Sequence, residues 1–217
     1  MSALASDGRT TVAVITGHHA FDVPNFHRLF RGMASVDAYI QTLDDFVADA
    51  GRARADYDVV LFYNFHQETP AEDSRERAVL VEALERGQGV FVMHHAVLAY
   101  LEWQEWADLV GVQERGFGYH IGETLRVEVV DPDHPITAGV KAWEMIDETY
   151  SMASCGDDSH ALLQTDHEKS MKTIGWTREV GNSRVFCLQS GHDNDTWKEP
   201  AFQRVTEQGI GWCAGGS

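Results

Sequence analysis

The sequence predicts an α/β protein whose doubly wound sheet is mostly parallel and carries an antiparallel extension. Two observations lead to this fold class. The first two thirds of the chain alternates short apolar runs with segments of helical spacing, which is typical of repeated strand–helix units. The last third is richer in short strand-like runs, which favours additional strands in the same sheet.

The strands of the first part are expected to be buried on both faces. Their sequences are apolar almost without interruption, as in the run Thr-Val-Ala-Val-Ile-Thr at 11–16. The run at 123–130 alternates instead and suits a half-exposed strand. We expect strands at 11–16, 38–43, 57–64, 89–93, 123–130, 143–148, 161–164, 172–176 and 184–188.

Helices are expected where apolar side chains recur every three or four residues. Pro24 stands near the start of one such segment and Gly87 follows the end of another, which are positions that these residue types favour. The predicted helices cover 25–33, 69–86, 96–110 and 200–212. The chain contains no repeat, low-complexity tract or linker, so we expect one domain over residues 1–217 with its core from about 11 to 213.

The composition indicates which kinds of partner and which cellular compartment are expected. The net charge of −17, from 34 acidic and 17 basic residues, argues against binding to nucleic acid. No apolar run reaches the roughly 20 residues of a membrane span, and residues 1–10 lack an apolar signal core. The three cysteines have no metal-type or redox-type spacing. A cytoplasmic protein is the simplest interpretation; whether it forms a homo-oligomer stays open.

Five apolar runs end in histidine or a carboxylate. If they are neighbouring strands of one parallel sheet, their carboxyl ends share the edge at which ligands of open α/β sheets bind. The runs and the residues that follow them are 12–17 with His18-His19, 59–64 with His66, 90–93 with His94-His95, 143–146 with Asp147-Glu148, and 185–188 with His192-Asp193.

The pair His94-His95 stands where a strand turns into the next predicted helix. Hydrolases of related architecture expose their nucleophile at such a turn, but here the position carries imidazole. Adjacent side chains at a strand end point to opposite sides, so only one of the pair is expected to face the cleft. We expect His95 to be that residue; the alternative is one core and one surface histidine without a functional role.

Two further positions offer acid–base groups. His192 precedes Asp193, whose carboxylate can orient the imidazole through a hydrogen bond. Glu148 ends an otherwise apolar run with Tyr150 close by, and can act as a general acid or base or as a metal ligand. A capping or surface role for the carboxylates is the alternative. The predicted catalytic residues are therefore His95, Glu148 and His192.

We also expect the substrate contacts and a metal site at this edge of the sheet. His120 lies in a glycine-containing loop that can close over a ligand. The predicted substrate-binding residues are His19, Asn64, His66, His120, Tyr150, Asp193 and Trp197. His19, His95 and His192 with an open position would suit Zn²⁺ or a similar divalent ion. The chain has no compact His-Glu-x-x-His motif, and it has neither a dinucleotide fingerprint nor a phosphate loop, so no nucleotide cofactor is expected.

Six motifs in order along the chain resemble the ThuA-like (trehalose utilisation) family. The resemblance as a whole covers nearly the entire chain, from about residue 11 to about residue 212. The motifs are GQGVFVMHH at 87–95, DHPITAG at 133–139, DETY at 147–150, WTR at 176–178, RVF at 184–186 and GHD at 191–193.

The resemblance implies a fold similar to class I glutamine amidotransferases, a flavodoxin-like three-layer sandwich. It also implies that the amidotransferase cysteine is missing, with His94-His95 in its region, so the protein is not a glutaminase. Family members are associated with the catabolism of trehalose and related disaccharides, alongside dehydrogenases that make 3-keto sugars. The segments Thr173–Trp176 and Gly181–Arg184 depart from the family pattern beside the expected site.

The leading functional hypothesis is an enzyme that acts on a disaccharide, glycoside or keto-sugar derivative. Proton transfer next to a carbonyl, giving isomerisation, elimination or glycoside cleavage, would use Glu148 or a histidine. His192 or His95 would polarise an oxygen, directly or through a metal. The alternatives are a non-catalytic sugar-binding or regulatory protein on the same scaffold and, less favoured, a metal-binding partner subunit.

Overall fold

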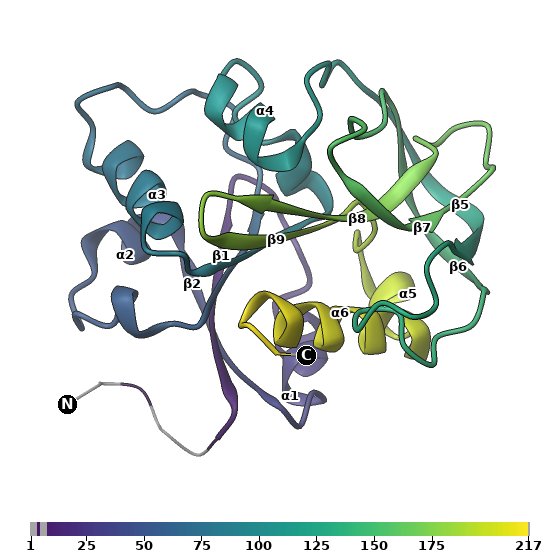
Figure 1. The fold of residues 1–217 in the computed structure, drawn as a ribbon, viewed down its shortest axis with the longest axis horizontal. Coiled ribbons are helices and arrows are strands. Elements are labelled where there is room, and N and C mark those ends of the chain that lie inside the picture. The colour runs from purple at the N-terminus through teal and green to yellow at the C-terminus, as the bar shows by residue number, and fades with distance from the viewer. Residues whose placement is uncertain (1–3, 5–7, 217) are drawn as a thin grey trace.

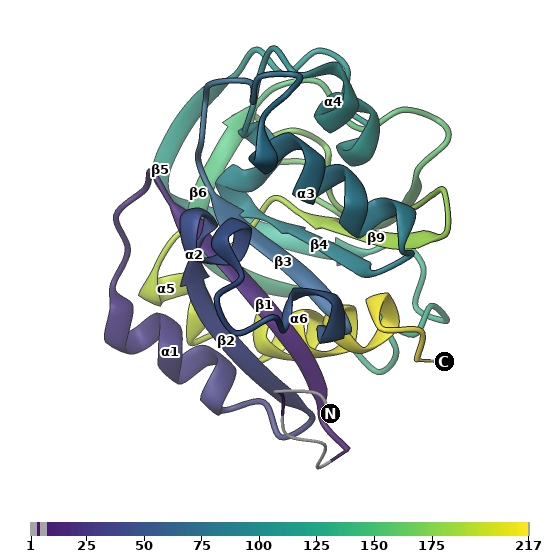
Figure 2. The same ribbon diagram turned by 90° about the vertical axis from the view of Figure 1, so that its left-hand side faces the viewer.

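A nine-stranded sheet with helices on both of its faces forms the protein (Figures 1 and 2). The computed structural model describes Leu4 and residues 8–216. The strand order is β2-β1-β3-β4-β9-β8-β7-β5-β6. The strands are β1 (Thr10–Gly17), β2 (Val36–Thr42), β3 (Val59–Asn64), β4 (Gly89–Met93), β5 (Gly118–Val129), β6 (Trp143–Ser151), β7 (His160–Gln164), β8 (Thr173–Val180) and β9 (Ser183–Leu188).

The helices divide between the two faces of the sheet. Helices α3 and α4 cover one face, while α1 and α6 cover the other (Figures 1 and 2). This is the three-layer arrangement expected from alternating strands and helices. The helices are α1 (Val23–Arg31), α2 (Leu43–Ala48), α3 (Arg75–Glu85), α4 (Gln104–Val110), α5 (Asn194–Trp197) and α6 (Pro200–Cys213), with 3₁₀ segments at Arg54–Asp56 and His94–Leu98.

The first half of the sheet is parallel, as the apolar runs predicted. Strands β2, β1, β3, β4 and β9 pair in parallel, and the side chains of β3 and β4 are buried on both faces. Their carboxyl ends therefore meet at one edge, which receives the residues that follow β1, β3, β4 and β9.

The expectation of a mostly parallel sheet is wrong. The pairs β9–β8, β8–β7, β7–β5 and β5–β6 are all antiparallel, so half of the neighbouring pairs run each way. Short connections explain the difference, because a parallel pair needs a long crossover whereas an antiparallel pair needs only a turn. Strands β8 and β9, for example, are joined by Gly181 and Asn182, and Gly181 has a φ of +59°.

Strand β6 does not belong to the parallel set that was predicted to share one edge. It is the outermost strand of the antiparallel half and pairs with β5 alone among the described strands. The sequence places the 143–148 run either in the parallel set or in the antiparallel extension, because an apolar run carries no information on its direction. The carboxylates Asp147 and Glu148 nevertheless reach the same edge.

Capping residues account for the shifted helix boundaries. The helix predicted from 69 begins at Arg75, because the Ser74 side chain accepts the Arg77 N–H as an N-cap. Likewise Thr42 caps α2, which ends β2 one residue earlier than predicted. The helix predicted at 96–110 is a 3₁₀ turn followed by the short α4. No helix among the described residues is long and apolar enough to cross a membrane.

Tight packing of α6 on the sheet gives a test of the fold. A Cβ on Gly89 would lie 2.4 Å from the Cys213 carbonyl oxygen, whereas one on Gly51 meets nothing within 4 Å. We expect Gly89→Ala to lower the free energy of unfolding by about 1–3 kcal/mol, because backbone must move to admit the methyl group. Gly51→Ala is the matched control and should stay within about 0.5 kcal/mol of the parent. Urea unfolding measures the stability of both variants, and equal stabilities of Gly89→Ala and Gly51→Ala would contradict this packing.

Candidate active site

The turn after β4 places two histidines at the edge of the sheet. His94 adopts a φ of +56°, in the left-handed region that a residue with a side chain seldom occupies. This sharp turn directs the two imidazoles into different surroundings, and both side chains are buried. Nδ1–H of His94 donates to the Gln189 carbonyl at 2.8 Å, and Nε2–H of His95 donates to the Tyr63 carbonyl at 3.2 Å. A free lone pair is therefore left on Nδ1 of His95, while Nε2 of His94 is the nitrogen that faces Glu148.

Strand β6 reaches this edge because β5 is long. The last residues of β5, Glu128 and Val129, pair with β7, while its preceding part pairs with β6 and carries it past the end of the sheet. The Gln189 side chain then donates to the Glu148 carbonyl at 2.8 Å and ties β6 to the end of β9.

A buried carboxylate completes the attachment of β6. Asp147 accepts the backbone N–H groups of Gly191 and His192, each at 3.0 Å, and of Glu148 at 2.9 Å. Burial raises the pKa of Asp147, an effect that His94 and these backbone donors oppose. Asp147 thus fixes Glu148 and His192 relative to each other, although they lie on distant parts of the chain.

Three side chains meet as a nearly equilateral triangle of possible ligand atoms. Oε2 of Glu148 lies 3.1 Å from Nε2 of His94 and 3.2 Å from Nδ1 of His192, and the two nitrogens are 3.2 Å apart. Among the described residues this is the group of histidine, cysteine and carboxylate side chains whose donor atoms lie close enough together to share one metal ion. We refer to His94, Glu148 and His192 as the triad.

Hydrogen bonds set the charges within the triad. Burial would raise the pKa of Glu148, but its hydrogen bonds with His192 and His94 outweigh burial and hold that pKa well below its usual range. The hydrogen bond between Glu148 and His192 also raises the pKa of His192. The phenol of Tyr150 donates to Oε2 of Glu148 at 3.0 Å and also lies 3.0 Å from Nε2 of His94. Glu148 is therefore an anion in a largely buried setting.

Two further imidazoles lie beside the triad. The rings of His19 and His95 stack with centroids 4.2 Å apart, and His19 also approaches His192. Burial, followed by the neighbouring imidazoles, lowers the pKa of both His19 and His95, so both are neutral. Nδ1 of each is buried without a hydrogen-bond partner. Unpaired nitrogens of this kind are typical of functional sites.

A cavity of about 330 Å³ opens from the triad. Its size falls within the range of about 300–1,000 Å³ that is typical of small-molecule sites. Five of the ten lining residues carry acid–base groups of the site, and the other five form an apolar wall. The lining residues are His19, Phe65, His95, Leu98, Phe117, Tyr119, Ile121, Glu148, Tyr150 and His192.

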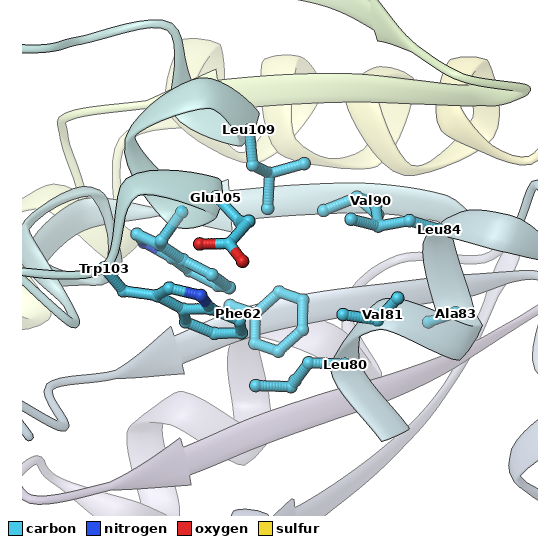
Figure 3. Close-up of a pocket in the computed structure, with 10 residues that line it drawn as sticks. Phe62, Leu80, Val81, Ala83, Leu84, Val90, Trp103, Glu105 and Leu109 are labelled. Atoms are coloured by element: carbon cyan, nitrogen blue, oxygen red, sulfur yellow. The ribbon is translucent and has the colours of Figure 1, made fainter. Parts of the chain in front are cut away.

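A second pocket, shown in Figure 3, has a different character. It lies among α3, α4 and strands β3 and β4, is walled by side chains such as Phe62, Trp103 and Leu109, and has a volume of about 30 Å³. That is room for roughly two water molecules. None of the predicted site residues lines it, so we interpret it as a packing gap in the core.

The structure brings together five of the predicted residues: His19, His95, Glu148, Tyr150 and His192 all line the cavity. The proposed metal ligands His19 and His95 stand outside the triad, which contains His94 in their place. The alternation rule predicts that His94 and His95 point to different sides, but it does not predict that strand β6 approaches His94.

Five predicted substrate contacts do not line the cavity. Asn64 and His66 are bonded to each other at 3.0 Å, with His66 stacked on His18. The remaining three have structural partners: His120 lies 3.3 Å from the Ser151 hydroxyl, Asp193 caps α5, and Trp197 donates to the Gly191 carbonyl from the core. Sequence reasoning missed Gln189 and the apolar wall formed by Phe65, Leu98, Phe117, Tyr119 and Ile121.

Solved structures show the same fold at low identity. A ThuA-like protein from Parabacteroides merdae is 19% identical with a TM-score of 0.76 over 95% of this chain and 90% of that one. One from Bacteroides uniformis is 17% identical with a TM-score of 0.69 over 97% and 94%. PurLQS from Thermotoga maritima is 13% identical with a TM-score of 0.61 over 94% and 99%. No curated protein sequence matches the chain significantly.

The protein thus has the α/β fold of these structures, and its turn after β4 carries two histidines. The family model described as trehalose utilisation matches residues 12–213. The chain therefore belongs to the ThuA family.

The role of Asp147 can be tested through stability. In Asp147→Asn the amide can accept some of the three backbone N–H groups but presents its own donors to the rest. We expect the free energy of unfolding to fall by about 1–3 kcal/mol, the usual cost of a buried unsatisfied polar group. Asp157→Asn, at an exposed position, is the control and should be neutral. A neutral Asp147→Asn in urea unfolding would contradict the role of this carboxylate.

Proposed function

We propose that the protein is an enzyme that acts on a sugar derivative by acid–base chemistry assisted by a divalent metal ion, with the triad as the metal ligands. The triangle of donor atoms, with sides of 3.1–3.2 Å, is the observation that carries this proposal. Ligand atoms about 2.0–2.1 Å from a tetrahedral Zn²⁺ lie roughly 3.3 Å apart, so the triad already has nearly the required spacing.

The surroundings of the triad also fit a metal. Because Nδ1–H of His94 is bonded to the Gln189 carbonyl, its Nε2 lone pair faces the other two ligands, and such an outer contact is usual for metal-bound histidine. Two imidazoles and one carboxylate are a ligand set of catalytic zinc sites, in which a fourth position stays open to substrate. Glu148 and His192 both line the cavity, which gives that position access to a ligand.

Each remaining group of the site has a chemical role. A bound divalent ion would polarise a substrate oxygen or lower the pKa of a bound water. His95 and His19 are neutral imidazoles with unpaired nitrogens, so they suit proton transfer to and from the substrate. Tyr150 holds Glu148 in place and offers its hydroxyl at the same wall of the cavity.

A carbohydrate substrate is supported by the family and by the site. The family is described by trehalose utilisation, which associates its members with sugar metabolism. The cavity offers imidazoles and a phenol beside aromatic rings, a combination that suits a polyol. We favour a disaccharide, glycoside or keto-sugar derivative and a hydrolase, lyase or isomerase reaction. Glutaminase chemistry is disfavoured because His94 and His95 occupy the turn after β4.

Metal content gives the first test of this proposal. Protein purified without a histidine tag is expected to contain about one divalent ion per chain by elemental analysis. Both His94→Ala and His192→Ala should lower that content at least tenfold, because each removes one of three ligands. His27→Ala, at a position outside the cavity, is the control and should keep the metal. Full metal in the first two variants would exclude the triad as the binding site.

Turnover gives the second test. We expect a 3-keto-disaccharide or keto-glycoside to be converted, as followed by NMR and mass spectrometry. The variant His95→Gln should lower kcat by about 10²–10⁴-fold, the usual contribution of a general acid or base, while metal content and circular dichroism stay unchanged. Ligand-induced stabilisation without any product in the parent protein would instead indicate a sugar-binding or regulatory protein.

A further inference from the structure

The cavity has an apolar wall that begins at the triad. The Phe117 ring lies 5.8 Å from Tyr150 and 6.4 Å from Phe65, both in edge-on geometry, and Phe65 in turn lies 5.6 Å from His95. Aromatic contacts are thus continuous from the acid–base groups outward. The wall consists of Phe65, Leu98, Phe117, Tyr119 and Ile121, and we call these residues the apolar wall.

The outer end of the apolar wall exposes large side chains to solvent. Tyr119 and Ile121 are each 62% exposed, the highest values among the exposed large hydrophobic residues of the described chain. Both line the cavity, with Ile121 in the β-bulge of β5, while His120 between them lies near Ser151. Clustered exposed apolar side chains at the mouth of a pocket are typical of a ligand surface.

Apart from the triad, the cavity offers no group that would bind an anion as an ion pair. Its ten lining residues include neither lysine nor arginine, and its one carboxylate, Glu148, belongs to the triad. The whole chain carries a net charge of −17, which further disfavours anionic ligands. A charged group on the part of the substrate that lies away from the triad would therefore lose its hydration without gaining a cation.

We infer that the apolar wall is a subsite for a flat apolar group, so that the substrate is an uncharged glycoside with an aromatic aglycone. This inference rests on the proposed function, since the triad and its neighbours would hold the sugar. A second sugar ring at the wall would bury hydroxyl groups against Leu98, Phe117 and Ile121, whose side chains form no hydrogen bonds. An aromatic ring instead stacks on Phe117 and Tyr119 and covers Ile121.

Calorimetric binding to the full-length, metal-loaded protein tests this inference. The probes are C-linked 3-ketoglucosides, whose carbon-bound aglycone is not expelled by proton removal next to the ketone, with a phenyl, a methyl or a glucosyl aglycone. We expect the phenyl compound to bind at least tenfold more tightly than the methyl compound, and the glucosyl compound no more tightly than the methyl one. The variants Tyr119→Ser and Ile121→Ser, at exposed positions that should leave the fold intact, are expected to reduce the phenyl preference below threefold.

Val130→Ser, at a position 47% exposed and outside the cavity, is the matched control and should keep the tenfold preference. Equal affinities for the three probes would overturn the aromatic subsite while leaving a sugar site in place. Tightest binding of the glucosyl compound would assign the wall to a second sugar and likewise overturn it. Failure of all three probes to bind would overturn both the subsite and the proposed sugar substrate.

Discussion

The attachment of β6 to the loop between β9 and α5 is the contact on which the site depends. Strand β6 is at the far end of the strand order from β2, four strands away from β9, so sheet pairing alone would not bring it to the turn after β4. The backbone N–H groups of Gly191 and His192 bond the buried Asp147 carboxylate instead. The Gln189 and Thr196 side chains add hydrogen bonds to backbone carbonyls of β6. Hydrogen bonds to a carboxylate are among the stronger ones, which suits a contact between elements that are not paired in the sheet.

The turn after β4 shows how this scaffold holds a side chain at the edge of the sheet. A left-handed residue at a strand–helix turn presents its side chain there. With His94 at this position, the side chain is an imidazole whose Nε2 lies within hydrogen-bond distance of Glu148 from β6. The scaffold thus supplies a fixed point, and the chemistry is decided by what the antiparallel extension brings to that point.

Much of the fold could be predicted from the sequence, because buried parallel strands are marked by continuous apolar runs. Eight of the nine strands lie close to where they were expected, and four of the five chosen runs end at one edge. Strand β5 begins at Gly118 instead of 123, so the segment with His120 that was expected to be a loop is part of the strand. The direction of β6 and the partners of His94 could not be predicted, since both depend on contacts between distant segments. Asp193 and Trp197 resembled site residues only by proximity to His192; their hydrogen bonds cap α5 and secure the loop.

The charge balance of the site favours chemistry in which negative charge develops on the substrate. The only lining carboxylate is Glu148, and the stacked His19 and His95 are neutral. With a divalent ion bound to the proposed triad, the centre would carry a net charge of about +1 within a partly apolar cavity, where electrostatic interactions are stronger than in water. Such a centre would stabilise negative charge that develops on a substrate oxygen. Because the lining contains neither lysine nor arginine, a metal held by the proposed triad would be the main source of this stabilisation.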